Sequence, residues 1–394
     1  MGLVADDLTG ASDSAVQFAE AGWTASVERL PLRPEQDEPS GDRPAVIAVA
    51  TGVRAAAAEH AADRTARAVR HLLARGVDRL FIKIDSTVRG SVAEQVRGAL
   101  SAWATGERPM AVICPAFPEL GRTVVGGAVL VDGIPVSATA AADDPVTPVA
   151  ESRLDVLLPG AVLANPIDLL TAGAAQSDEL LVFDAASVDD LARVADVLDR
   201  LGRPAVAVGS AGLAKAVAAR WGGSHPAPHP APAGRLLVAV SSLHPATLLQ
   251  LARLRGYLSR CEDRDVQILT GPPERAVAGH ATEIAAQLAD DVAEEVRTSA
   301  YDGLVLVGGD GAAAILDQLQ VESVRIYSAV VPGAPDGRVV GGPADRLRLV
   351  TKSGGFGGPD TLIAIVQRLR SAHLASEVAG AQPVSTHPNP REDS

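Results

Sequence analysis

Aromatic residues and basic charge are scarce in this chain. Only 3% of its 394 residues are Phe, Trp or Tyr, so a core must be built mainly from Ala, Val and Leu. The 35 Lys and Arg residues are outnumbered by 48 Asp and Glu, which gives a formal net charge of -13. This balance argues against nucleic acid as a main partner, because phosphate neutralisation needs clustered cations. A small anionic ligand is still compatible, since it needs only a few local cations and backbone amides.

Cysteine is rare, and long apolar runs are absent. Cys114 and Cys261 lie far apart without the spacing of metal ligands, which fits a reducing cytoplasmic location. Cys114 has no His nearby in the sequence, so we expect a small core residue rather than a nucleophile. Because Asp6 and Asp7 interrupt the first apolar run, no signal peptide is expected. No later run is long enough to cross a bilayer, so we expect no membrane partner.

Short apolar runs alternate with Ala-rich helical stretches through most of the chain. Strands are expected at 3–5, 46–50, 79–84, 110–114, 180–183 and 205–208, and again at 236–240, 266–269, 304–307 and 347–351. Helical patterns lie between several of them, for example at 55–74 and 188–201. This alternation predicts an α/β fold in which each of two domains is a mainly parallel sheet flanked by helices.

A Pro-rich segment divides the chain. Residues 222–234 alternate Pro with Ala and His, which excludes a helix or a central strand and predicts an extended linker. The predicted domains are therefore 1–221 and 235–370. Residues 371–394 carry Pro, Ser, His and charge without periodicity, and we expect a disordered tail.

Paired carboxylates follow the first expected strand. Asp6 and Asp7 stand where this strand gives way to a helix, and in a parallel sheet ligands bind beyond the carboxyl ends of the strands. Two adjacent acids cost repulsion and desolvation unless a cation, a sugar hydroxyl or a hydrogen-bond network offsets them. The alternative is that one Asp caps the helix and the other is solvated.

A second strand end combines both charge signs with hydroxyl groups. Lys83, Asp85, Ser86 and Arg89 follow the expected strand at 79–84. Such a cluster suits a polyhydroxylated carboxylate, because cations pair with the carboxylate and Asp accepts hydrogen bonds from hydroxyls. The alternative is a surface ion-pair cluster with Ser86 as a helix cap.

Arg122 lies in a loop that two prolines rigidify. Its planar guanidinium can bind a carboxylate through two hydrogen bonds. The alternative is an ordinary surface arginine paired with Glu119.

Two glycine-rich turns follow strands in the second half of the chain. Gly308–Gly311 leads into a helix, and Lys352–Gly355 precedes the last one. Glycines let a backbone approach phosphate oxygens, and helix N-termini supply amide donors, so the two turns together predict a nucleotide site. Neither turn is a Walker A loop, and the missing G-x-G-x-x-G fingerprint disfavours a dehydrogenase. His244 follows another strand, and Thr247 beside it could serve as a helix cap.

An ordered set of motifs resembles the family of four-carbon acid sugar kinases. The matching motifs are ADDLTGA at 5–11, DSTVRG at 85–90, PAFPELGRT at 115–123, DPVTP at 144–148, GSAGL at 209–213, SLHPAT at 242–247, GGD at 308–310 and KSGGFG at 352–357. The resemblance spans residues 2 to about 369. It implies an acid-sugar-binding domain, a nucleotide-binding domain, and transfer of phosphate from ATP, with Mg²⁺, to a terminal hydroxyl of a threonate-, erythronate- or oxo-tetronate-like acid.

The resemblance also implies roles by position. Asp6, Asp7, Arg54, Lys83, Asp85, Ser86, Arg89 and Arg122 would line the sugar side, and Ser242, His244, Gly308, Gly309, Asp310, Gly311, Lys352, Ser353, Gly354 and Gly355 the ATP side. We expect Asp7 to accept the proton of the attacking hydroxyl, with Asp6 orienting it or reaching Mg²⁺. Lys83, Arg89 and Arg122 would hold the substrate carboxylate. The metal ligands stay unassigned.

The chain departs from the family pattern at three places. Thr51-Gly-Val-Arg54 stands where the family usually shows Asp-Ser-Arg, so only Arg54 is kept. Ser241 stands where glycine is common, and Gly311 where threonine is common. Two alternatives therefore stay open: a degenerate member that senses a sugar acid or nucleotide without turnover, and a kinase with a changed hydroxy-acid substrate. The expected partners are the sugar acid and ATP, and a homodimer is left open.

Overall fold

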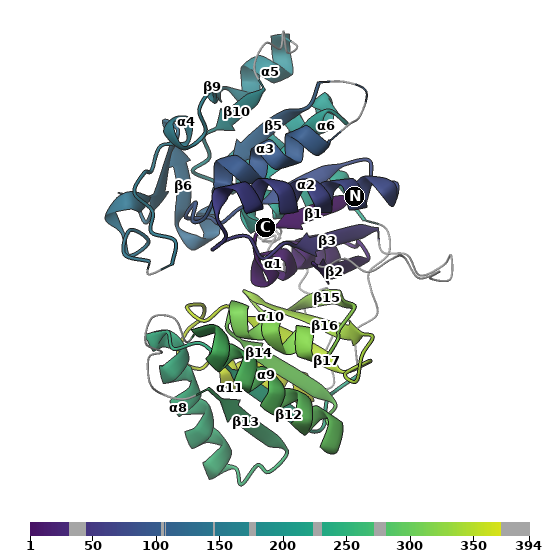
Figure 1. Ribbon diagram of the computed structural model, residues 1–394. Helices are drawn as coiled ribbons and strands as arrows, with labels where there is room; N and C mark the ends of the chain where they lie inside the picture. The colour runs from purple at the N-terminus through teal and green to yellow at the C-terminus, as the bar shows by residue number, and fades with distance from the viewer. Residues whose placement is uncertain are drawn as a thin grey trace, which may run out of the picture.

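The computed structural model describes residues 1–30, 45–103, 106, 108–144, 146–172, 179–223, 231–271 and 281–371. Its main feature is a 14-stranded sheet with helices on both faces, in the order β13-β12-β14-β17-β16-β15-β2-β3-β1-β4-β11-β5-β10-β9 (Figure 1). Within the described ranges, no helix combines the length and apolar character needed to cross a membrane.

The N-terminal half of the chain forms the wholly parallel part of this sheet. Its strands are β1 (Gly2–Ala5), β2 (Ala25–Arg29), β3 (Val46–Ala50), β4 (Leu80–Lys83), β5 (Met110–Cys114), β9 (Val162–Ala164), β10 (Leu180–Phe183) and β11 (Ala205–Gly209). Its helices are α1 (Leu8–Glu20), α2 (Ala58–Ala74), α3 (Val92–Ala102), α4 (Leu154–Leu157), α5 (Pro166–Ala172), α6 (Val188–Leu201) and α7 (Ala211–Trp221). A separate antiparallel sheet contains β6 (Arg122–Val125), β7 (Ala128–Val131) and β8 (Ile134–Pro135).

The C-terminal half adds six strands. Parallel strands are β12 (Leu236–Val240), β13 (Val266–Thr270), β14 (Gly303–Val307) and β17 (Arg348–Lys352), and the antiparallel pair is β15 (Ser323–Val331) and β16 (Ala334–Val340). The helices are α8 (Pro245–Arg260), α9 (Ala281–Thr298), α10 (Gly309–Gln318) and α11 (Thr361–Arg370).

The two parts of the sheet join edge to edge. Strand β15 pairs antiparallel with β2, with Ser323 opposite Glu28 and Ile326 opposite Ala25. Next to this seam Arg29 Nη1 donates to the carbonyl of Ala313 at 3.0 Å and to Asp317 at 2.6 Å. The parallel strands of the two halves run in opposite directions in this sheet, because β15, β16 and β17 each reverse the direction of the strand before. The halves nevertheless meet closely, since a Cβ on Gly309, which follows β14, would lie 3.7 Å from Thr9, which follows β1.

The predicted fold class is confirmed, and the core has the predicted composition. Strands β1, β3, β5, β11, β12 and β14 are buried at every position, which explains their near-continuous apolar sequences. Cys114 is fully buried in β5, and burial raises the pKa of its thiol to about 12, so it is a core residue as expected. The residues 224–230 of the expected linker and 372–394 of the expected tail lie outside the described residues, and the domain limits stay a prediction.

Candidate active site

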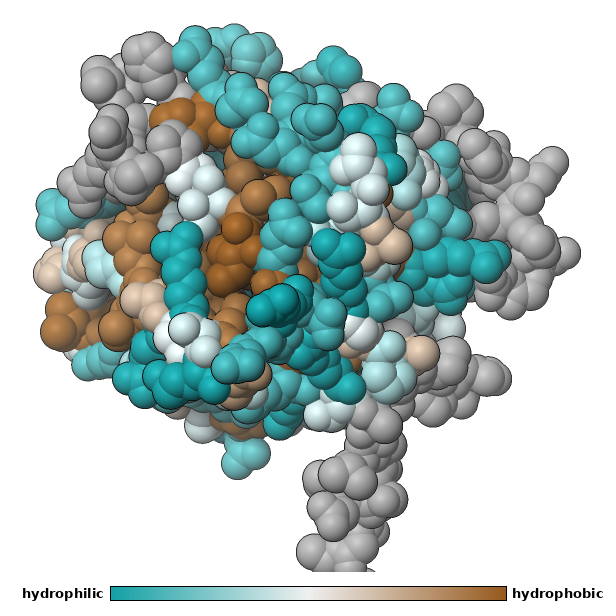
Figure 2. Space-filling model, turned by 90° about the horizontal axis from the view of Figure 1, so that it is seen from below, coloured by the Kyte–Doolittle hydropathy of each residue, from teal (hydrophilic) through white to brown (hydrophobic). Residues whose placement is uncertain are grey.

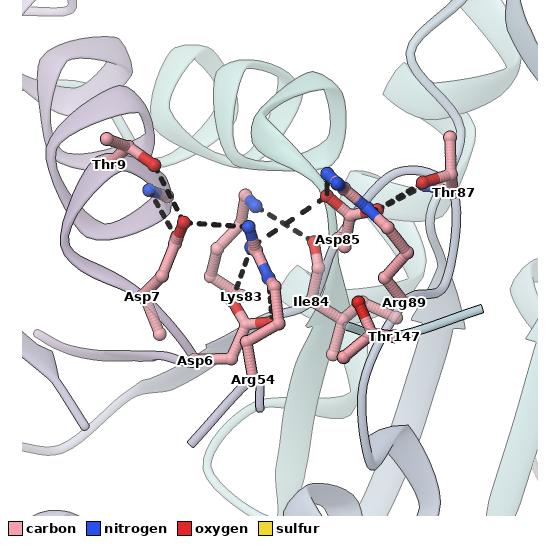
Figure 3. A network of polar contacts seen from close by, with 12 residues as sticks. Asp6, Asp7, Thr9, Arg54, Lys83, Ile84, Asp85, Thr87, Arg89 and Thr147 are labelled. Carbon is pink, nitrogen blue, oxygen red and sulfur yellow. Dashed lines mark hydrogen bonds and ion pairs between the residues drawn. The ribbon is translucent and has the colours of Figure 1, made fainter. Parts of the chain in front are cut away.

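Arg54 is the centre of a network of carboxylates at the end of β1 (Figure 3). Its Nε and Nη2 donate to the two oxygens of Asp6, both at 2.8 Å, and its Nη1 donates to Asp7 Oδ2 at 2.7 Å. The carboxylate of Asp85 lies 3.8 Å from Nη2. One guanidinium therefore offsets the repulsion among three acids at the ends of two neighbouring strands.

The two adjacent acids have different environments. Asp6 is fully buried, and this burial raises the pKa of its carboxyl despite the bidentate contact with Arg54. For Asp7, burial acts in the same direction, but Arg54, Lys83 and hydrogen bonds outweigh it, so its pKa is lowered. Together with Asp85, these two acids raise the pKa of Arg54 well above its usual range, which keeps the guanidinium charged.

Asp7 also begins helix α1. As the N-cap, its Oδ1 accepts from the amide of Gly10 at 2.7 Å, and its Oδ2 accepts from Thr9 Oγ1 at 2.7 Å. The expectation that one Asp caps the helix is confirmed, but the accompanying expectation of a solvated second Asp is wrong, because Asp6 is buried. Gly10 is required here, since a Cβ on it would lie 2.5 Å from Asp7 Oδ1 and 3.2 Å from Lys83 Nζ.

A second network surrounds Asp85 at the end of β4. Arg89 donates to both of its oxygens at 2.9 Å and reaches Asp144 at 3.2 Å, and the amide of Thr87 donates to it at 3.1 Å. The charges of Arg54 and Arg89 overcome the effect of burial and lower the pKa of Asp85. Helix α3 is preceded by Ser91 at its N-cap, so the alternative that Ser86 caps a helix is wrong.

These networks border a cavity of about 550 Å³, which we call the polar cavity. It is lined by residues of both halves of the chain: Thr9, Gly10, Asp13, Arg54, Lys83, Asp85, Ser86, Thr87, Arg89, Phe117, Leu120, Arg122, Ala140, Ala141, Asp143, Asp144, Ser210, Ala211, His244, Gly333, Pro335, Thr351, Ser353, Gly355 and Phe356. Six of the eight residues predicted for the sugar side are in this lining. The remaining two, Asp6 and Asp7, are not part of the lining, but both bind Arg54, which is.

Two cations in the polar cavity keep donors that no described carboxylate occupies. Lys83 is buried, and its Nζ donates to the backbone carbonyl of Ile84 at 2.9 Å. Arg122 donates from Nη1 to the carbonyl of Leu120. The alternative pairing of Arg122 with Glu119 is wrong, because Glu119 forms an ion pair with Lys215 at 2.8 Å.

Asp13 is a cavity residue that the sequence analysis missed. It lies on α1, is half-buried and lines the polar cavity. Burial raises the pKa of its carboxyl, against the opposing effect of Lys83. The i, i+3 spacing from Gly10 was the available signal, since it places Asp13 on the helix face that Gly10 presents.

A second cavity of about 470 Å³, the apolar cavity, lies in the C-terminal half. One wall contains Leu248, Leu251, Ile284 and Leu288, and the face of this half seen in Figure 2 carries apolar residues (brown) within a hydrophilic surround. The other wall is the predicted phosphate side: Ser242, His244, Gly308, Gly309, Asp310, Gly311, Gly354 and Gly355.

The two cavities share His244 and Gly355. His244 is the N-cap of α8, with Nδ1 accepting from the amide of Ala246 at 3.1 Å, so the suggestion that Thr247 caps this helix is wrong. The first glycine-rich turn also reaches the carboxylate network: a Cβ on Gly309 would lie 3.7 Å from Thr9 Oγ1 and 3.9 Å from Asp7 Oδ2. Two ligands bound in these cavities would therefore meet beside Asp7.

Lys352 and Ser353 were both predicted on the ATP side, and the structure separates them. Ser353 lines the polar cavity, whereas Lys352 is buried and lines neither cavity. Its Nζ donates to the carbonyls of Ser353 at 2.7 Å and Gly354 at 3.3 Å.

The described residues contain no cluster of three or more His, Cys, Asp or Glu side chains suited to a metal ion. Asp6, Asp7 and Asp85 are each bound by arginine and are poor candidates. Asp310 is exposed in the apolar cavity, and Mg²⁺ in phosphotransferases is commonly held by one or two carboxylates together with substrate phosphates. Asp310 therefore fits a Mg²⁺ ion that enters the cavity together with a nucleotide.

Comparison with known proteins agrees with the division of the site into a sugar side in the N-terminal half and a nucleotide side in the C-terminal half. Residues 1–217 match the model of a sugar-binding N-terminal domain, and residues 259–362 match that of a nucleotide-binding C-terminal domain. The chain is 38% identical to a D-threonate kinase of Bordetella bronchiseptica, over 94% of this chain and 97% of the relative. It is 30% identical to a D-erythronate kinase of Heliobacterium modesticaldum, over 93% and 96%.

A solved structure from Bordetella bronchiseptica is also similar. It is described as a domain of unknown function with bound citrate, in a domain-swapped dimer, and is 38% identical over 94% of this chain and 98% of that one, with a TM-score of 0.51. From its two matched domains and its relatives, the chain belongs to the four-carbon acid sugar kinase family.

Proposed function

We propose that this protein transfers a phosphoryl group from ATP to the terminal hydroxyl of a four-carbon sugar acid, with D-threonate as the first candidate. The observation that carries this proposal is the pair of adjoining cavities that share His244 and Gly355. The polar cavity, with its mixed charges and hydroxyls, suits a hydroxylated carboxylate. The apolar cavity, with its glycine-rich wall, suits a nucleoside base and its phosphates.

On the sugar side, we assign the substrate carboxylate to Lys83 and Arg122, because Arg89 is bound by Asp85 and Asp144. Arg89 and Asp85 then hold the loop that carries Ser86, which lines the polar cavity. The Bordetella relative was solved with bound citrate, a carboxylate, which agrees with a carboxylate ligand for this protein.

For proton transfer we keep Asp7 as the acceptor from the attacking hydroxyl. It lies between the polar cavity and the Gly308–Gly309 turn, and phosphoryl transfer depends more on positioning and charge than on a strong base. Asp6 does not contact the cavity and acts by holding Arg54. Asp13 is assigned to a substrate hydroxyl.

On the ATP side, the adenine would contact Leu248 and Ile284, and the phosphates would lie against the amides of the two glycine-rich turns. Ser242 and Asp310 line the same cavity. Mg²⁺, held by Asp310 and the phosphates, would neutralise charge on the transferred group. Closure of the two halves around both ligands would exclude water, which otherwise hydrolyses ATP.

We also propose a cytoplasmic enzyme, on the basis of its two free cysteines, and a homodimer, by analogy with the dimer of the Bordetella relative. Both are separate from the chemistry proposed above, since one chain contributes residues to both cavities.

The test is release of ADP from Mg-ATP with D- and L-threonate, D- and L-erythronate and their 3-oxo forms. Release with one acid and not with its epimers supports the kinase and names its substrate. If no acid supports release while ATP still raises the melting temperature, the substrate is a different hydroxy acid. If ATP does not bind, the protein is a sensor or a degenerate member and the proposal fails.

A further inference from the structure

The loop between β17 and α11 has its carbonyl groups turned towards buried side chains. The carbonyls of Ser353, Gly354, Phe356, Gly357 and Gly358 all accept hydrogen bonds from side chains of α8 or β17. Three residues supply these bonds: Thr247, Gln250 and Lys352, which are 0%, 0% and 1% exposed. Such an arrangement is unusual, because loops normally leave their carbonyls to water.

Gln250 donates more hydrogen bonds to the loop carbonyls than Thr247 or Lys352. Its Nε2 lies 3.0 Å from each of three successive carbonyls, those of Phe356, Gly357 and Gly358. Its Oε1 is buried and has no partner among the described residues. The orientation of the amide follows from this, since Oε1 could not face three carbonyl oxygens. A buried acceptor without a partner costs stability, so this side chain is present for its donor group.

Thr247 and Lys352 act on the first part of the loop. Thr247 Oγ1 donates to the carbonyl of Gly354 at 2.5 Å, and Lys352 Nζ donates to Ser353 and Gly354. Burial alone lowers the pKa of Lys352, and among the described residues no carboxylate forms an ion pair with it. A lysine in the core without a carboxylate is costly, and its described partners are loop carbonyls alone.

The opposite side of the loop faces the cavities. Gly354 and Gly355 line the apolar cavity, and within the described part of the chain their amides donate no hydrogen bond. A larger residue at Gly354 would disturb this side of the loop, because a Cβ on it would lie 2.0 Å from Ser242 Oγ. With its carbonyls held inward, the loop presents amides to the position that we assigned to the ATP phosphates.

We infer that Gln250, with Thr247 and Lys352, is a positioning residue that fixes the Ser353–Gly358 loop in its phosphate-binding conformation before ATP arrives. Without these donors, the carbonyls turn towards the cavity and repel the phosphates. The inference rests on the proposed ATP-binding role of this loop.

The test compares Gln250→Leu with wild type in steady-state kinetics, together with the dissociation constant of ATP. Gln250→Leu removes the amide donors and shortens the side chain by one atom. We expect KM and Kd for ATP to rise about tenfold or more, and KM for the sugar acid to change less than about twofold. Gln367→Leu is the matched control. Gln367 lies on the neighbouring α11, and among the described residues its side chain donates to the hydroxyl of the half-buried Tyr257 at 3.1 Å and not to the loop.

A second, milder variant keeps the inference testable if Gln250→Leu does not fold. Thr247→Val removes one hydroxyl at nearly constant volume and is expected to weaken ATP binding without affecting the sugar acid. Faster hydrogen exchange of loop amides in the free variant would support the positioning role. Unchanged ATP affinity in folded Gln250→Leu, or an equal loss for both substrates, would overturn it.

Gly354→Ala separates this inference from the proposed function. If Gly354→Ala abolishes ATP binding and Gln250→Leu does not, the loop binds ATP and only the positioning role fails. If Gly354→Ala leaves ATP binding unchanged, the assignment of the phosphates to this loop fails first.

Discussion

The side chain of Ser241 occupies the space that a side chain at Gly311 would need. A Cβ built on Gly311 would lie 2.2 Å from both Cβ and Oγ of Ser241. Ser241 Oγ also donates to the carbonyl of Val307 at 3.1 Å, which fixes its position beside the Gly308 turn. The two departures noted in the sequence, serine for a common glycine and glycine for a common threonine, are therefore one coupled exchange.

This coupling predicts the outcome of a double-mutant cycle. Gly311→Thr alone should clash with Ser241, lowering stability by about 1–3 kcal/mol and raising KM for ATP. The double variant Ser241→Gly/Gly311→Thr should recover most of both losses, because the new side chain then has room. Thermal unfolding and ATP kinetics on the four proteins measure the coupling. Simple addition of the two single effects would contradict it.

Arg54 should be needed for both stability and activity. In Arg54→Gln, the buried carboxylate of Asp6 loses its bidentate partner, and Asp7 and Asp85 lose a nearby positive charge. Breaking a buried ion pair in this way typically costs about 3–5 kcal/mol. The free energy of unfolding from urea titration is the measurement.

The control for Arg54 is Arg67→Gln. Arg67 pairs with Asp63 at 2.6 Å on the surface of α2, where both side chains are more than half exposed. Its loss should change stability by less than about 1 kcal/mol. Equal effects of the two variants would show that the network around Arg54 is not a special feature of the site.

Asp7 and Asp13 should be distinguishable by kinetics. Asp7→Asn is expected to lower kcat by at least about 100-fold while leaving KM for ATP nearly unchanged, because it removes the proposed proton acceptor. Asp13→Asn should instead raise KM for the sugar acid by about tenfold, since one hydrogen bond to a charged group is weakened. The opposite pattern would assign proton transfer to Asp13, which lines the polar cavity directly.

Sequence patterns predicted most of the parallel strands closely, but missed β2 and β9 and the antiparallel pair β15 and β16. Strands β3 and β5 match their expected bounds, because strands buried on both faces read as unbroken apolar runs. Strands β15 and β16 mix buried with half-exposed residues and include Gly337, which weakens the pattern. The pairing of β15 with β2 joins segments about 300 residues apart, and local periodicity carries no information about it.

The site was predicted by residue type and position, but its pairings were not. The polar cavity contains Arg54, Lys83 and Arg122 as expected, yet only the structure shows which of them carboxylates already bind. Gln250 was missed because a glutamine in an amphipathic helix resembles a solvent-exposed residue. Its function depends on a loop about 100 residues further along the chain.

Finally, ATP use should depend on pH through Lys352. Burial lowers the pKa of Lys352 to about 8, so its ammonium is charged below that pH and loses its charge above it. The charged form binds the carbonyls of Ser353 and Gly354 more strongly, and kcat/KM for ATP should therefore fall as pH rises through about 8. Lys352→Arg stays charged at all accessible pH values, so its profile should lack this step wherever the variant folds. The measurement is kcat/KM for ATP from about pH 6.5 to about 9.5, with kcat/KM for the sugar acid as the internal control. An identical step in wild type and Lys352→Arg would assign the titration to another group.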